Sequence, residues 1–90
     1  AQSSLNKLAA LLRNGQGAIR IEGFTDNKGA DAANMALSQR RANAVLVALR
    51  AGGLSSTRLK ASGKGKAQPV ADNGSEAGRA RNRRVEIIVN

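Results

Sequence analysis

Apolar residues recur at helical spacing near the start of the chain and then alternate with polar ones. The leucines repeat every three or four residues, which predicts a helix over residues 2–13 that Ser3 or Ser4 caps and two glycines end. Residues 18–23 alternate apolar and polar side chains, which is typical of a half-buried strand. The pattern therefore predicts a helix followed by a short strand.

A longer helix and a second strand are predicted next. The helix is expected over residues 32–51, with Asp31 as its cap and Gly52 and Gly53 after its last turn. A weaker strand is expected over residues 57–62. A helix that connects two strands favours a sheet with helices packed on it.

The last third of the chain combines a loop, a helical turn and a strand. Residues 63–78 are rich in glycine, and Ser75 is expected to cap a short helical turn over residues 76–81. The last strand, residues 84–89, has apolar side chains on both faces, which predicts cover on both sides. The order of elements predicts an α/β fold, an α+β sandwich in one domain over residues 1–90, with helices packed on one face of a small mixed sheet.

Composition narrows the possible functions of this 90-residue chain. It contains no histidine and no cysteine, which excludes imidazole and thiolate catalysis and the usual zinc ligands, and we expect neither a metal nor a cofactor. No apolar run approaches the roughly 20 residues of a membrane-spanning helix. A net charge of +9 favours an anionic partner, yet the single aromatic residue, Phe24, argues against proteins that stack bases on several aromatic rings.

Arg41 stands out because it lies in the middle of the apolar stripe of the predicted long helix. At about 100° per residue, that stripe contains Leu37, Ala44, Val45, Ala48 and Leu49. A guanidinium is not deprotonated in proteins, so an arginine there needs an anion, and Asp26 in the preceding loop is the nearest acidic candidate in sequence. Two interpretations are open. The pair is an internal salt bridge that fixes the loop, or it is half-open and binds a zwitterion, with Arg41 on the carboxylate and Asp26 on the ammonium.

A second cluster of charge precedes the last strand. It consists of Arg79, Arg81, Arg83 and Arg84. These residues are either surface and loop-bracing charges or a basic patch for an anionic polymer. Asn82 lies between them and is expected to hydrogen-bond loop backbone, as asparagine often does at turns.

Four stretches of the chain carry a family resemblance. They are "GFTDNKG", "NMALSQRRA", "GKGKAQP" and "NGSEAGRARNRRVE". In order and spacing they resemble the motif blocks of the OmpA-like C-terminal domain, the OmpA/MotB peptidoglycan-binding family, and the match covers residues 18–90 with the family's first strand missing. The resemblance implies non-catalytic binding of peptidoglycan through the diaminopimelate residue of the stem peptide.

The resemblance also assigns residues to a diaminopimelate site. Asp26, in the T-D motif, would take the ammonium end, and Arg41, in the R-A motif, would take the carboxylate end. The other positions that shape the family pocket or lie near it are Thr25, Asn34, Leu37 and Arg83. Phe24 stands where the family usually has a histidine, which removes the imidazole hydrogen bonds and leaves the aspartate in place.

Partners and location follow from the same resemblance. The parent protein is expected to be membrane-anchored and to tether the cell wall to the outer membrane from the periplasm. A sheet without the family's first strand has a free edge, which predicts a homodimer. The alternative function is a basic nucleic-acid or polyanion-binding module, although nucleic acid is not the expected partner. An enzyme is not expected, because Asp26 beside an arginine stays ionised and has no second carboxylate placed to assist it.

Overall fold

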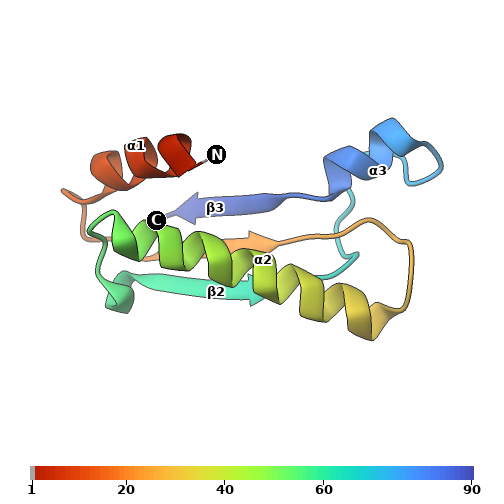
Figure 1. The fold of residues 1–90 in the computed structure, drawn as a ribbon, viewed down its shortest axis with the longest axis horizontal. Coiled ribbons are helices and arrows are strands. Elements are labelled where there is room, and N and C mark those ends of the chain that lie inside the picture. The colour runs from red at the N-terminus through yellow and green to blue at the C-terminus, as the bar shows by residue number, and fades with distance from the viewer. Residues whose placement is uncertain (1) are drawn as a thin grey trace.

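The structure of this protein is a computed structural model that describes residues 2–90. Its elements are α1 (Gln2–Leu12), β1 (Ile19–Gly23), α2 (Asp31–Ala51), the 3₁₀ helix η1 (Ser56–Arg58), β2 (Leu59–Gly63), α3 (Glu76–Asn82) and β3 (Val85–Val89) (Figure 1). The predicted order is confirmed, and the predicted ends differ from the observed ones by at most two residues. None of the helices within residues 2–90 is long and apolar enough to cross a membrane.

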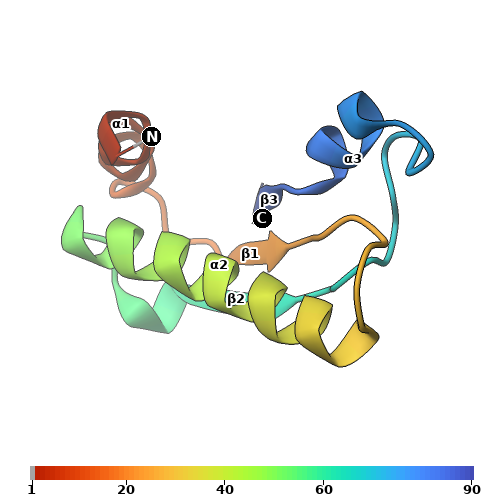
Figure 2. The same ribbon diagram turned by 45° about the vertical axis from the view of Figure 1, so that its right-hand side comes forward.

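The three strands of the described chain form one mixed sheet in the order β2-β1-β3. β1 pairs with β2 in parallel and with β3 antiparallel, which makes β1 the central strand. The register places Gly23 beside Gly63 of β2, and Ile21 beside Ile87 of β3. α2 connects the two parallel strands and packs against both of them, while α1 and α3 lie at opposite ends of the sheet (Figure 2).

The core lies between the sheet and the two longer helices. Its fully buried side chains are Ala9 of α1, Ile19 and Ile21 of β1, and Ala42 and Leu49 of α2. Successive strand residues point to opposite faces, so Arg20 and Glu22 lie on the other face of β1, where they form an ion pair at 3.6 Å. The α+β sandwich with its helices on one face of a mixed sheet is therefore confirmed.

Two glycines allow α2 to approach the sheet closely. A Cβ at Gly23 would collide with the carbonyl oxygen of Ser38, and a Cβ at Gly63 would lie 2.6 Å from the Ser38 Oγ. The Ser38 Oγ also accepts a hydrogen bond from the backbone N–H of Gly65 at 3.0 Å. Small residues of α2 therefore face the sheet at the point where the paired glycines leave room for them.

This close contact gives α2 a different rotation from the predicted one. Its buried residues are Asn34, Ser38, Ala42 and Leu49. Ala44, which was expected in the apolar stripe, is exposed, and Arg41 is half-buried at the edge of the buried face. The prediction that Arg41 lies in the middle of the core stripe is wrong, because the glycines of the sheet decide which face of the helix packs.

The predicted helix caps are correct at one helix of three. Ser3 and Ser4 lie inside α1, so neither is its cap. Asp31 is the first residue of α2 and likewise does not cap it; its carboxylate forms an ion pair with Lys66 at 3.0 Å. Ser75 does cap α3, because its side chain accepts a hydrogen bond from a backbone N–H of the first turn.

β3 is an edge strand, and its outer side has no strand partner within residues 2–90. Most of its residues are half-buried and Val89 is exposed, so the expected cover on both faces is wrong. Ile88 pairs in register with Arg20 on the charged face of the sheet. Within residues 2–90, the side chains on both faces of this strand are therefore only partly covered.

We expect the edge of β3 that has no strand partner within residues 2–90 to pair with a second copy of the chain at high protein concentration. An unpaired row of N–H and C=O groups is a template for strand addition, and a lysine on an edge strand opposes it. Light scattering over a dilution series should show a dimer that Val89→Lys weakens. Val47→Lys, at an exposed valine of α2, is the matched control and should leave the dimer unchanged. A strict monomer at all concentrations would contradict this expectation.

Candidate ligand-binding site

The loop between β1 and α2, residues 24–30, is fixed by hydrogen bonds on both sides. The backbone N–H of Phe24 donates to the carbonyl of Arg84, just before β3, at 2.8 Å. The backbone N–H of Thr25 donates to the carbonyl of Gly65, just after β2, also at 2.8 Å. The start of the loop therefore continues the sheet, which holds the following residue in one place.

Two of the predicted site residues, Thr25 and Asn34, support this loop from inside. Thr25 is 4% exposed, and its Oγ1 donates to the carbonyl of Asp26 at 2.9 Å. Asn34 is buried in the first turns of α2, and its Nδ2 donates to the carbonyl of Lys28 at 3.0 Å. Both side chains thus shape the loop through hydrogen bonds within the protein.

The Asp26 carboxylate is ionised and held by two donors. One oxygen accepts the backbone N–H of Lys28 at 3.0 Å, and the other accepts the Arg83 Nη1 at 2.9 Å. These two hydrogen bonds, the backbone one first, lower the pKa of Asp26 below its ordinary value of 3.8. The side chain keeps 13% of its surface exposed, so part of the side chain remains accessible.

Arg83 bridges Asp26 to a second carboxylate. Its Nη2 donates to the Glu76 Oε1 at 2.7 Å, and Arg79 donates to the other oxygen of Glu76 at 3.2 Å. The hydrogen bond from Arg83 lowers the pKa of Glu76, and the bonds to Glu76 and Asp26 raise the pKa of Arg83. We call these three residues the Asp26–Arg83–Glu76 cluster.

Arg41 does not take part in this cluster. It makes no hydrogen bond and no ion pair with any of residues 2–90. The interpretation of Asp26 and Arg41 as an internal salt bridge is therefore wrong. The reason is the register of β3, since the bond between Phe24 and Arg84 brings the neighbouring Arg83 beside Asp26.

Gln39 shows which way the predicted site residues of α2 point. Its Nε2 donates to the carbonyl of Ala61 at 3.2 Å, and its Oε1 accepts the N–H of Gly63 at 2.8 Å, so this side of α2 faces β2. Residues two positions apart lie on nearly opposite sides of a helix. Leu37 and Arg41, both half-buried, therefore share the side of α2 that faces away from β2.

Comparison of the sequence with known proteins shows the family to which this chain is similar. Residues 1–83 match the OmpA family. The chain belongs to the OmpA family. It is similar to the outer-membrane lipoprotein YfiB of Pseudomonas aeruginosa, 43% identical over 90 residues, which covers 99% of this chain and 54% of that protein. It is also similar to the peptidoglycan-binding protein ArfA of Mycobacterium tuberculosis, 43% identical over 72 residues, or 80% of this chain and 22% of that protein.

Solved structures agree with this assignment. The crystal structure of the peptidoglycan-associated lipoprotein from Burkholderia pseudomallei matches with a TM-score of 0.93 and 38% identity, covering 99% of this chain and 76% of that one. The chain spans about half the length of YfiB and about a fifth of ArfA. The similarity to these OmpA-family relatives therefore extends over only part of each of them.

Phe24, which replaces the expected family histidine, is a core residue in this OmpA-family domain. Its side chain is fully buried, and the Arg84 guanidinium carbon lies 3.9 Å from the ring centroid. Arg84 in turn donates to Glu86 at 2.7 Å and to the carbonyl of Gln68 at 3.0 Å. Position 24 therefore supports the fold here and presents no polar group to a ligand.

The C-terminal signature of the family braces the loop after β2. Asn82 is buried, and its Oδ1 accepts the backbone N–H groups of Val70 and Ala71 at 2.8 and 3.0 Å. This confirms the expected bonds from Asn82 to loop backbone. Arg79 also donates to the carbonyl of Asn73 at 3.0 Å. The loop-bracing interpretation is thus confirmed for Arg79, and the same holds for Arg83 and Arg84 through the bonds described above.

Sequence reasoning missed two features of this end of the molecule. One is the clamp between Gln39 and β2, for which an isolated glutamine gives no signal. The other is a pocket beside the loop after β2, which the stretch "GKGKAQP" helps to line. No group of three or more acidic residues suited to a metal ion occurs within residues 2–90.

Proposed function

We propose that this domain binds peptidoglycan, without catalysing a reaction on it, through the diaminopimelate residue of the stem peptide. The names of two similar proteins support the partner, since one is a peptidoglycan-binding protein and one is peptidoglycan-associated. The observation that carries the proposal is Arg41, a half-buried arginine that no anion within residues 2–90 neutralises. An unpaired charge at a partly buried position favours binding of an anionic group.

Asp26 forms the half of the site that binds the ammonium of the ligand. A carboxylate has about four lone-pair positions, and Asp26 uses one on each oxygen for Lys28 and Arg83. Its exposed face can therefore accept an N–H from a ligand ammonium while the bond to Arg83 remains. Arg83 contributes by holding the carboxylate ionised and in position.

Arg41 forms the half of the site that binds the carboxylate of the ligand. A planar guanidinium donates two parallel hydrogen bonds to one carboxylate, which a lysine ammonium cannot do. Because Arg41 has no partner within residues 2–90, it gains these bonds without giving up others. This site therefore selects for a ligand that carries a free carboxylate.

The distal carbon of diaminopimelate carries both groups, an ammonium and a carboxylate. Asn34 fastens the Asp26 loop to α2, and Arg41 lies seven positions further along the helix, a rise of roughly 10 Å along its axis. Leu37 lies between them on the same side of α2 as Arg41. We assign to Leu37 the apolar contact with the methylene chain of the ligand.

We also propose that the parent protein places this domain in the periplasm and links the cell wall to the outer membrane. The support is the similarity to an outer-membrane lipoprotein and to a peptidoglycan-associated lipoprotein. Fractionation of cells that express the full-length protein should place it with the outer membrane and the wall.

Binding to insoluble cell-wall sacculi tests the function. The domain should sediment with sacculi at low salt and still do so in part at high salt, because partly buried charge pairs are screened less than exposed ones. A polyanion-binding module, the alternative that the net charge of +9 favours, should lose the sacculi with salt and bind DNA with a steep salt dependence. Complete release from sacculi at high salt would contradict the proposal.

Arg81 is the arginine of the C-terminal cluster that is exposed and has no partner within residues 2–90. An exposed charge contributes roughly 0–1 kcal/mol, so Arg81→Gln should weaken sacculus binding less than about threefold and flatten its salt dependence. Arg84→Gln should instead lower the melting temperature, because Arg84 packs on Phe24. Arg50→Gln, which also removes one arginine but at an exposed position of α2, is the control for both measurements. Complete loss of binding in a folded Arg81→Gln variant would place the site at Arg81.

A further inference from the structure

Two asparagines of this chain, Asn14 and Asn73, are each followed by a glycine. The side-chain amide of an asparagine can be attacked by the backbone nitrogen of the next residue, and a glycine there has no Cβ to obstruct the approach. Asn14 lies in the loop between α1 and β1, and Asn73 lies in the loop between β2 and α3. The structure around each pair decides how readily it reacts.

The nitrogen that would attack the Asn73 side chain is held against a carboxylate. The backbone N–H of Gly74 donates to the Asp72 Oδ1 at 2.8 Å. A Cβ at Gly74 would lie 3.1 Å from the same oxygen, so the carboxylate packs against this glycine. A general base must lie within roughly 2.6–3.2 Å of the atom whose proton it takes. Asp72 is therefore placed to accept the proton as the Gly74 nitrogen becomes a nucleophile.

The side-chain carbonyl of Asn73 is polarised by a second residue. Its Oδ1 accepts the Asn82 Nδ2 at 2.7 Å. Asn82 is buried and also bonds to the backbone of residues 70 and 71, so its amide is fixed in place. Donors at about 2.7–3.1 Å stabilise the negative charge that develops on the oxygen of an attacked carbonyl. Asn82 therefore makes the Asn73 side chain a better electrophile.

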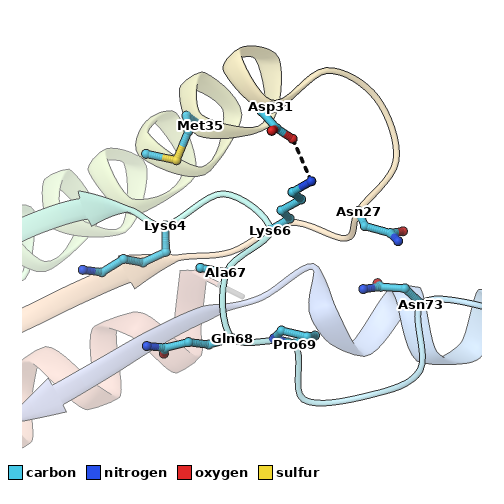
Figure 3. Close-up of a pocket in the computed structure, with 9 residues that line it drawn as sticks. All are labelled: Asn27, Asp31, Met35, Lys64, Lys66, Ala67, Gln68, Pro69 and Asn73. Atoms are coloured by element: carbon cyan, nitrogen blue, oxygen red, sulfur yellow. Dashed lines mark ion pairs between the residues drawn. The ribbon is translucent and has the colours of Figure 1, made fainter.

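The amide nitrogen that would leave Asn73 faces open space. Its Nδ2 has no acceptor within residues 2–90. The side chain extends from its loop toward a pocket of about 680 Å³, which lies between the first turns of α2 and the loop from β2 to α3 (Figure 3). Ammonia can therefore leave through this pocket, and water can reach the same carbon.

The pair of Asn14 and Gly15 has none of these contacts and serves as an internal comparison. The backbone N–H of Gly15 donates to the carbonyl of Leu12 at 3.1 Å, and a peptide carbonyl does not accept a proton at neutral pH. The side chain of Asn14 is exposed and has no hydrogen-bond partner within residues 2–90. The sequence also has no acidic residue before Glu22. This pair therefore has neither a base nor a donor to its carbonyl.

We propose that Asn73 is a site of self-catalysed deamidation. The Gly74 nitrogen forms a bond to the Asn73 Cγ while its proton passes to Asp72. The bond between Cγ and Nδ2 then breaks, and the amide nitrogen takes that proton and leaves as ammonia. Water opens the resulting succinimide at either of its two carbonyl carbons, which gives aspartate or isoaspartate at position 73. The whole reaction consumes water, releases ammonia and returns Asp72 to its original state.

Either product changes the loop before α3. Aspartate adds a negative charge to the wall of the pocket, while its oxygens can still accept the bond from Asn82. Isoaspartate carries the main chain through Cβ and Cγ, which lengthens the chain beside the carbonyl that accepts the Arg79 Nη1. The modification therefore changes both the charge of the pocket wall and the support of the loop.

Peptide mapping after incubation of the folded protein at neutral pH tests the proposal. Trypsin cleaves after lysine and arginine, so residues 14–20 and 67–79 form two peptides with one of the asparagine–glycine pairs each. Mass spectrometry follows the replacement of the amide by a carboxyl group in each peptide. Positioned bases and oxyanion donors each contribute about a hundredfold or more in enzymes, and we expect Asn73 to convert at least about tenfold faster than Asn14. Equal rates in the folded protein would overturn the proposal.

Unfolding should change the two rates in opposite directions. In denaturant Asp72 and Asn82 are no longer held in position, so the conversion of Asn73 should slow by about tenfold. Asn14 should react faster, because its glycine no longer donates to a helix carbonyl. If denaturant also speeds the conversion of Asn73, the fold protects this pair and the proposal is wrong.

Asp72→Asn isolates the role of the carboxylate. Its amide oxygen can still accept the Gly74 N–H but is a far weaker base, so Asn73 should convert at least about tenfold more slowly while Asn14 keeps its rate. Asp31→Asn also replaces an exposed carboxylate by an amide, and this matched control should keep both rates of the wild type. A rate at Asn73 that Asp72→Asn leaves unchanged overturns the proposal, because the carboxylate then takes no part in the reaction.

Discussion

Arg41→Lys is expected to bind a diaminopimelate-containing stem peptide at least about thirtyfold more weakly than the wild type. Removing one partner of a close charge pair in an interface costs about 2–5 kcal/mol, and tenfold in affinity corresponds to about 1.4 kcal/mol. Lysine keeps the charge and loses the planar pair of donors. The free energy of unfolding should change by less than about 0.5 kcal/mol, because Arg41 has no partner within residues 2–90.

Arg40→Lys is the matched control for this measurement. Arg40 is the neighbouring arginine, is exposed, and also has no partner within residues 2–90. It should bind as the wild type does. A stem peptide with lysine in place of diaminopimelate lacks the distal carboxylate and should bind the wild type about as weakly as the diaminopimelate peptide binds Arg41→Lys. If Arg41→Lys binds normally, or if the wild type binds both peptides equally, the carboxylate does not lie on Arg41.

Asp26→Asn should lower both affinity and stability. The ligand ammonium loses a charged acceptor, and hydrogen bonds to charged groups contribute roughly 1.5–3 kcal/mol, or about tenfold or more in affinity. The folded protein loses the acceptor for Arg83 or for the Lys28 N–H, since an amide has a single oxygen. Calorimetry and thermal melts on the same preparation measure the two effects separately.

The pH dependence of stability gives a second measurement of the Asp26–Arg83–Glu76 cluster. Folding lowers the pKa of Asp26 and of Glu76 from ordinary values of 3.8 and 4.5. Their contribution to the free energy of unfolding is therefore complete above these ordinary values and is lost as the pH falls through the lowered ones. The melting temperature of the wild type should fall below about pH 4 more steeply than that of Asp26→Asn.

Glu76→Gln separates the structural role of the cluster from binding. Glu76 pairs with Arg83 and Arg79 and is not assigned to the ligand. This variant should also flatten the acid transition, whereas its affinity for the stem peptide should stay close to that of the wild type. Normal peptide affinity in a folded Asp26→Asn variant would show that Asp26 is not part of the site. An unchanged acid transition in both variants would contradict the cluster's role in stability.

The elements of this fold follow from local information along the chain. Each signal that predicts an element spans only a few residues, because backbone conformation and capping depend on near neighbours. These signals are the helical spacing of leucines, the strict alternation before Gly23, the paired glycines after α2 and the serine before α3. The sandwich follows as well, since a helix between strands has few ways to cover a sheet. Arg41 and Asp26 could also be singled out, because an arginine on an apolar face and a nearby acid violate the ordinary pattern.

The partners of those residues depend on contacts between segments far apart in the sequence. Gly23 and Gly63 lie side by side only after β1 and β2 pair, and their joint surface sets the rotation of α2 that moves Arg41 to the edge of the core. The register of β3 brings Arg83 to Asp26, 57 residues away, and leaves Arg41 without an anionic partner within residues 2–90. Helical periodicity shows which residues share a face but not how that face is rotated over the sheet, and no local pattern encodes the register of a distant strand. These long-range contacts separate Asp26 from Arg41, which we propose form the two halves of a site, and only tertiary packing decides this separation.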